Sequence, residues 1–265
     1  GFIRFQPSEV MKVSMPLALA WWLSKKALPP DLPSLAVALA MVAVPSGLIV
    51  QQPDLGTSLL VATSGLATIY MAGIQWRYVF SMIALALVSI WPAWVFALKD
   101  YQKQRVLTLF NPESDRLGAG WNIIQSKTAI GSGGWEGLGW TKGSQAQLDF
   151  LPEGHTDFII AVLAEEFGFR GVLFLFLIYA VILGRGLVIT WQAQSSFAQM
   201  LGGALVATFF FGLLVNLGMV SGLLPVVGVP LPMVSYGGTA MVSMMIAFGM
   251  LMAISTERPV TRAMR

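Results

Sequence analysis

Residues 157–184 read DFIIAVLAEEFGFRGVLFLFLIYAVILG, and the second half of this stretch carries no charged side chain. A helix that spans the hydrocarbon core of a bilayer needs about 20 mostly apolar residues. At a rise of about 1.5 Å per residue, a helix of this length exceeds a core that is about 30 Å thick. We therefore expect a membrane-spanning helix whose first turns project beyond the lipid or line a polar cavity.

Six further apolar stretches have about the length of a spanning helix. They are residues 9–27, 33–50, 55–73, 78–97, 199–221 and 233–254. A polar, glycine-rich stretch, residues 98–155, separates the fourth span from the fifth. The sequence thus predicts an all-α polytopic transmembrane helix bundle, with seven spans and one large loop in a single membrane domain over residues 1–265.

The composition agrees with a bilayer environment. Hydrophobic residues make up 56% of the chain and charged residues 11%, whereas soluble domains carry about 25% charged residues. The net charge is +3, but the basic residues mostly flank apolar stretches, so we assign no nucleic-acid role. With no cysteine and one histidine, any metal would be bound through oxygen atoms. Because the chain opens on Gly1 without a signal-type start, we expect it to begin inside a longer protein.

Lysines and arginines of the short loops indicate the orientation, because they are enriched on the cytoplasmic side of a membrane. They follow spans one, three, five and seven, and therefore share one side: Lys25, Lys26, Arg77, Arg185, Arg258, Arg262 and Arg265. That side, with the C-terminus, is predicted to be cytoplasmic. The 98–155 loop is then external.

Three acids begin spans that start on the external side: Glu9, Asp54 and Asp157. Each is also a residue that favours the first turn of a helix, where a negative charge gains about 0.3–1 kcal/mol. Ionisable groups at membrane depth usually mark a functional site. We expect at least one of the three to be functional, and together they are candidates to hold a divalent cation.

Two basic residues lie near the predicted external face, where short-loop positive charge is normally rare: Arg4 and Lys12. Lys12 follows Glu9 by one helical turn. It is a candidate to bind an anionic head group, and the alternative is a snorkelling side chain that pairs with Glu9.

The external loop has its own candidates. Arg105, Lys127 and Lys142 either bind phosphate or solvate the loop. His155 is a candidate proton shuttle or an ordinary surface residue. At the start of the fifth span, Glu166 and Arg170 have the spacing of an intrahelical ion pair, and Glu165 has no assigned role.

Glycine-rich runs occur at residues 131–140 and 235–238, but neither has the spacing of a nucleotide-binding loop, so nucleotide binding is rejected. The prolines and glycines of residues 221–238 predict irregular backbone. Such backbone is tolerated at membrane depth only where protein or a water-filled cavity covers it. We expect it to line the external cavity.

Separated motifs along nearly the whole chain resemble the shape, elongation, division and sporulation (SEDS) family. They are FQPSE (5–9), QQPDLGTS (51–58), YQKQRV (101–106), NPESD (111–115), LGAGWNIIQSK (117–127), AIGSGG (129–134), GLGW (137–140), KGSQAQLDFLPEGHTDFIIAVLAEEFG (142–168) and NLGMVSGLLPVVGVPLPMVSYGG (216–238). The resemblance implies ten spans with a large external loop between the seventh and eighth. The seven spans of this chain would then be the fourth to the tenth, and the first three are absent.

The resemblance also implies an activity, that of a peptidoglycan glycosyltransferase of the bacterial inner membrane. Such an enzyme polymerises lipid II for cell-wall elongation and cell shape, and works with a class B penicillin-binding protein. Asp157 matches the essential catalytic aspartate of the family, while Glu9 and Asp54 match its other important acids.

The chemistry needs a base to take the proton of the acceptor hydroxyl and positive charge to stabilise the leaving pyrophosphate. Asp157 is the candidate base. The positive charge would come from Arg4, Lys12, Arg105 or Lys127, or from a cation such as magnesium or manganese. Two other functions stay open: a flippase for a lipid-linked precursor, and a scaffold that positions a penicillin-binding protein in the membrane. Against a transporter, the acids cluster at one face and the halves show no inverted repeat.

Overall fold

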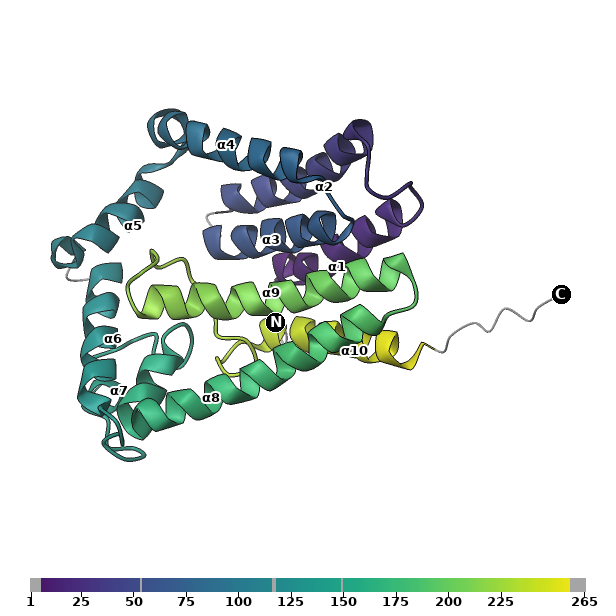
Figure 1. Ribbon diagram of the computed structural model, residues 1–265. Coiled ribbons are helices and arrows are strands. Elements are labelled where there is room, and N and C mark those ends of the chain that lie inside the picture. Colours follow the sequence, from purple (N-terminus) through teal and green to yellow (C-terminus); the bar gives the residue numbers. More distant parts are fainter. Residues whose placement is uncertain (1–5, 53, 116–117, 149, 258–265) are drawn as a thin grey trace. The chain divides into compact units, whose positions relative to one another are not determined.

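The computed structural model describes residues 6–52, 54–115, 118–148 and 150–257, and within these ranges every regular element is a helix. Figure 1 shows the helices in chain order. They are α1 (Pro7–Leu23), α2 (Leu32–Gln51), α3 (Leu55–Met71), α4 (Trp76–Pro92), a π-helical turn (Ala93–Ala97), α5 (Asp100–Phe110), a 3-10 turn (Pro112–Asp115), α6 (Ala119–Gly133), α7 (Ser144–Gln147), α8 (Ile159–Gln192), α9 (Ser196–Val220) and α10 (Gly238–Thr256). The all-α prediction is confirmed.

Five helical segments in the described ranges are long and apolar enough to cross a membrane. They are α2, α4 with part of the π-helical turn, α8, α9 and α10. α3 is apolar but has 17 residues, and α1, also of 17 residues, carries Glu9 and Lys12. The chain is therefore a helical membrane protein, and the count of seven spans stays a prediction.

The 98–155 stretch contains helices that its polar composition did not predict. α6 buries Ile123, Ser126, Ala129 and Gly133, which recur every three or four residues and so share one face. Small side chains dominate this face, so hydropathy does not reveal the helix.

The residues form two compact units. The first contains α1–α3, residues 180–192 of α8, residues 196–211 of α9, and α10. The second contains α4–α7, residues 159–179 of α8, residues 212–220 of α9, and residues 221–237.

Small residues bring helices close together in the first unit. Ser58 of α3 donates a 2.8 Å hydrogen bond to the main-chain oxygen of Ser46 in α2. A Cβ on Gly65 would lie 2.4 Å from a methyl group of Val42, so only glycine fits this contact without a shift. This is the packing expected of membrane helices, which associate through small side chains and hydrogen bonds.

In the second unit, α8 is interrupted at Gly168, whose backbone is left-handed and extended (φ 67°, ψ −167°). The break coincides with a close approach of the glycine-rich run, because a Cβ on Gly168 would lie 2.3 Å from the amide nitrogen of Gly137. Main-chain bonds join Leu138 to Glu165 and Phe169 to Gly134, both at 2.9 Å. Residues 134–139 thus replace the helical bonds that α8 lacks at its break.

Candidate active site

Asp157 lies in the turn that precedes α8, next to Phe158, which is fully buried. Three consecutive main-chain oxygens of this turn accept hydrogen bonds from later parts of the chain. The amide nitrogen of Tyr236 binds the oxygen of His155 at 3.0 Å, and the hydroxyl of Ser235 binds the oxygen of Thr156. The side-chain amide of Asn216 binds the oxygen of Asp157 at 2.8 Å.

The irregular backbone predicted for residues 221–238 is confirmed for residues 221–237, and it passes the Asp157 carboxylate. Gly228 has a φ of 75°, and a Cβ there would lie 3.5 Å from Asp157 Oδ2. The same Asn216 amide donates a second bond of 2.8 Å to the oxygen of Val229. Asn216 therefore joins α9, the turn of Asp157 and the irregular segment.

Burial and the negative charge of Glu153 raise the pKa of Asp157, the positive charge of Arg105 lowers it, and the net result is a pKa of about 6. A carboxyl group with a pKa near the working pH is suited to general acid–base catalysis. Arg105 comes from α5, in the stretch expected to form the large external loop. The structure therefore brings together two predicted site residues that are 52 positions apart.

Lys127 lies on the surface of α6 in the same unit. Its Nζ is 2.7 Å from the position that a Cβ on Gly222 would take, so glycine makes room for the ammonium group beside the irregular segment. Lys142 and His155 are exposed. These three residues stay candidates for contact with an anionic or hydroxyl-bearing substrate.

The predicted intrahelical pair of Glu166 and Arg170 is wrong, because the break at Gly168 lies between them. Glu166 instead accepts a 3.0 Å bond from the amide of Thr141, and Arg170 pairs with Glu136 at 2.5 Å. The neighbouring acid, Glu165, is fully buried and accepts a 2.9 Å bond from the amide of Gln145. Both glutamates thus anchor residues 141–145, which follow the glycine-rich run, to α8.

In the first unit, Glu9 and Lys12 form a buried ion pair, with Lys12 Nζ 2.6 Å from Glu9 Oε2. Ser243 of α10 donates a further bond of 3.2 Å to the same oxygen. This geometry agrees with the alternative in which Lys12 is the partner of Glu9 rather than a ligand for phosphate. Arg4 lies outside the described residues.

Asp54 caps α3, since its Oδ1 accepts a 3.0 Å bond from the amide of Thr57. Its other oxygen accepts a 2.9 Å bond from the side chain of Gln6, which precedes α1. The first turns of α1 and α3 therefore lie side by side, as expected for two spans that start on one face. The prediction that Asp157 shares this face is not tested.

A divalent cation does not fit the described residues well. Glu9 is neutralised by Lys12, and Asp54 is occupied by two donors. Within the described ranges, no three acidic or histidine side chains gather as a metal site requires. Magnesium or manganese stays an untested expectation.

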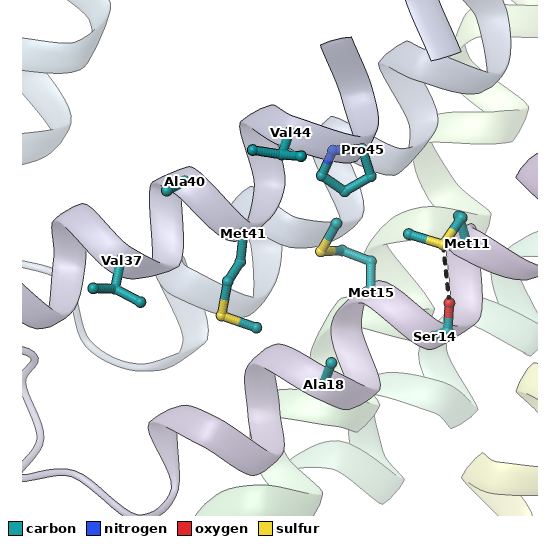
Figure 2. Close-up of a pocket in the computed structure, with 9 residues that line it drawn as sticks. All are labelled: Met11, Ser14, Met15, Ala18, Val37, Ala40, Met41, Val44 and Pro45. Carbon is teal, nitrogen blue, oxygen red and sulfur yellow. Dashed lines mark hydrogen bonds between the residues drawn. The ribbon is translucent and has the colours of Figure 1, made fainter. Parts of the chain in front are cut away.

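An apolar cavity of about 570 Å³ lies between α1 and α2 in the first unit (Figure 2). It has no titratable side chain and one hydroxyl, that of Ser14, which points to the sulfur of Met11 at 3.5 Å. Its walls are Met11, Ser14, Met15, Ala18, Val37, Ala40, Met41, Val44 and Pro45. The cavity lacks the groups that a reaction would need, and the candidate site remains the turn of Asp157.

The helices and the turn of Asp157 define a polytopic membrane protein with a carboxyl group of raised pKa. Residues 1–259 match the model of the cell cycle protein family of FtsW, RodA and SpoVE, and the chain belongs to this family. It is similar to peptidoglycan glycosyltransferase MrdB of Escherichia coli, with 50% identity over 258 residues that cover 97% of this chain and 70% of that protein.

Two solved structures are also similar. A chain from a study of polymerization and crosslinking by a peptidoglycan synthase complex has a TM-score of 0.82 and 29% identity, and the match covers 98% of this chain and 72% of that one. The rod shape determining protein RodA of Thermus thermophilus has a TM-score of 0.66 and 25% identity, with 98% and 68% covered. The chain therefore shares the helical fold of these two structures.

Asn216, Ser235 and Gly228 were not singled out from the sequence. A signal existed for Asn216, because it is a polar residue inside the apolar stretch 199–221, where such residues usually hydrogen-bond across helices. Ser235 and Gly228 sit among many similar residues of the irregular segment. Only the folded arrangement distinguishes them.

Proposed function

We propose that this chain is a peptidoglycan glycosyltransferase that polymerises lipid II, with Asp157 as the general base. The observation that supports this most strongly is the carboxyl of Asp157, which has a pKa of about 6 and sits on a turn whose main chain is held at three successive oxygens. Membership of the family and the name of the E. coli relative support the same activity.

The proposed reaction is a single displacement in which Asp157 is the base. A sugar hydroxyl of the acceptor attacks the anomeric carbon of the donor, and the bond from that carbon to the pyrophosphate oxygen breaks. Asp157 takes the proton of the attacking hydroxyl, and the pyrophosphate leaves with the bonding electron pair and the lipid. The configuration at the anomeric carbon is inverted, as in other single displacements with one base.

Arg105 and Lys127 are the proposed partners of the pyrophosphate. Arg105 is close enough to Asp157 to lower the pKa of its carboxyl, and Lys127 is exposed beside the irregular segment. A positive charge that faces a developing anion stabilises the transition state more than the ground state. The reaction as proposed needs no cation held by Glu9 or Asp54.

The proposal extends to partner and location. We propose a class B penicillin-binding protein as partner, because a structural relative is part of a peptidoglycan synthase complex that polymerises and crosslinks. We also propose the bacterial inner membrane as the location, with residues 98–155 external and the C-terminus cytoplasmic. In this location the protein would contact membrane lipids and bind lipid II as its substrate.

The test is glycan synthesis from purified lipid II by the full-length protein with a partner that lacks transglycosylase activity. Asp157→Asn keeps the size of the side chain but cannot act as the base, so the rate should fall by about 10²–10⁴-fold. Asp100→Asn, which removes an exposed acid at the start of α5, is the matched control and should keep its activity.

The same assay separates the alternatives. A flippase moves its lipid substrate across a membrane without forming a glycosidic bond, so it would make no polymer from lipid II in detergent micelles. A scaffold would make none either when its partner has no transglycosylase. A folded Asp157→Asn protein that polymerises lipid II at the rate of the unchanged protein would refute the assignment of the base.

A further inference from the structure

The main-chain oxygens of His155, Thr156 and Asp157 are held by three donors from residues that follow them by 59 to 81 positions. We infer that Asn216 and Ser235 are positioning residues, which set the direction of the Asp157 carboxylate for glycosyl transfer. This inference rests on the proposed function and adds to it the residues that make the base effective.

The turn needs such donors because it precedes the helix. Helical bonding does not fix the backbone of residues 155–157, since α8 begins at Ile159. A side chain can be no better oriented than the backbone that carries it. Within the turn, the amides of Thr156 and Phe158 donate to the oxygen of Glu153, while the oxygens of residues 155–157 are bound by the end of α9 and by the irregular segment.

Asn216 suits this task by its chemistry. It is fully buried, and both hydrogens of its amide are used, one on the oxygen of Asp157 and one on the oxygen of Val229. The opposite orientation of the amide would place its oxygen against two carbonyl oxygens, which only donors can satisfy. Among the described residues, the Asn216 Oδ1 atom has no hydrogen-bond partner, so the side chain is arranged for its two donors at the expense of its acceptor.

The bond to Val229 places the neighbouring Gly228 beside the carboxylate. A Cβ at Gly228 would be in contact with Asp157 Oδ2 at 3.5 Å. One amide thus fixes the main chain that carries the base and the main chain that faces it. Ser235 adds a second connection, since its hydroxyl donates to Thr156 and accepts a 2.8 Å bond from the amide of Leu231.

Tyr179 offers a matched control for a role in stability alone. Its buried hydroxyl donates a 2.7 Å bond to the oxygen of Pro232, in the same irregular segment, whereas the donors to the oxygens of residues 155–157 are Asn216, Ser235 and Tyr236. Tyr179→Phe removes one buried bond to the main chain and leaves the turn of Asp157 in place. Any loss of activity that follows only from a looser segment should appear in this variant too.

The experiment measures kcat and KM for lipid II in the full-length protein, with thermal unfolding as a check of folding. Asn216→Ala should lower kcat by about 10²-fold, the effect of displacing a catalytic group by about 1 Å. KM should be unchanged, because the lost bonds do not touch substrate. Ser235→Ala should show a smaller loss of the same kind, and Tyr179→Phe should keep both constants.

The inference would be overturned if folded Asn216→Ala and Ser235→Ala proteins keep kcat and change only in KM or in thermal stability. If Asn216→Ala does not fold, Ser235→Ala decides by itself, and an unchanged kcat counts against the inference. The proposed function is judged separately by Asp157→Asn. An inactive Asp157→Asn protein beside fully active Asn216 and Ser235 variants would reject the positioning role and keep the base.

Discussion

Lys12 Nζ lies 2.6 Å from Glu9 Oε2 inside α1, and both side chains are less than a tenth exposed. The hydroxyl of Ser243 in α10 completes the surroundings of the carboxylate. A buried ion pair adds little net stability, but removal of one partner leaves an uncompensated charge, which is strongly unfavourable. The pair is therefore a sensitive point of the first unit.

Lys12→Met should destabilise the protein by about 3–5 kcal/mol, because Glu9 would lose its counter-charge. Glu9→Gln in the Lys12→Met background should restore most of the loss, since no buried charge then remains. Thermal or denaturant unfolding in detergent measures both. A Lys12→Met protein of unchanged stability that binds lipid II weakly would instead assign Lys12 to the substrate.

The predicted orientation gives a second test, on a chain without cysteine. Single cysteines at Ser132 and Ser196, both exposed, should react differently with an impermeant thiol reagent in intact cells. We expect labelling at position 132 only, and labelling at both positions after the cells are permeabilised. Labelling at position 196 alone would invert the topology and move Asp157 to the cytoplasmic side.

Several helices could be predicted because apolar residues mark them over their whole length. The stretch 55–73 contains α3 (Leu55–Met71), and 199–221 overlaps α9 (Ser196–Val220). Hydropathy did not predict the full length of α8, nor did it predict α6. α8 extends beyond Arg185 to Gln192. α6 lies in a polar stretch and buries mostly small residues, so its sequence has no marked apolar pattern.

The candidate site was predicted in part. Asp157 and Arg105 were named from the sequence, and the structure places them within electrostatic reach. The residues that hold the turn were missed because their partners are main-chain atoms far away in sequence. A side chain's chemistry can be read from the sequence, but a bond such as that from Asn216 to the oxygen of Asp157 exists only once α9 has packed.

The break in α8 leads to a third prediction. Gly168→Ala should destabilise the protein by more than about 1 kcal/mol, because its φ is positive and the new Cβ would meet the main chain of Gly137. Gly184→Ala in the same helix is the matched control, since its Cβ meets nothing within 4 Å. A helical glycine replaced by alanine gains up to about 1 kcal/mol.

Thermal unfolding and limited proteolysis of residues 134–145 compare the two variants. Gly168→Ala should unfold at a lower temperature and be cut faster in this run, whose bonds to α8 depend on the break. If the two variants unfold at the same temperature and are cut at the same rate, the close contact of Gly137 with Gly168 does not hold residues 134–145 in place.

The raised pKa of Asp157 makes the rate of polymerisation depend on pH. The base is active when ionised, so the rate should rise as the pH passes through about 6 and then level off. Arg105 lowers this pKa and Glu153 raises it. Arg105→Gln should therefore move the midpoint to higher pH, and Glu153→Gln should move it to lower pH.

The midpoint, rather than the absolute rate, is the quantity to compare, because Arg105→Gln also removes a proposed contact with the pyrophosphate. Each profile is normalised to its own plateau, and the residual activity of Asp157→Asn should lack the rise near pH 6. Since the two substitutions change the local charge by the same amount in opposite senses, opposite displacements are the signature of a shared carboxyl. Displacements in the same direction, or a rise that persists in Asp157→Asn, would place the titrating base elsewhere.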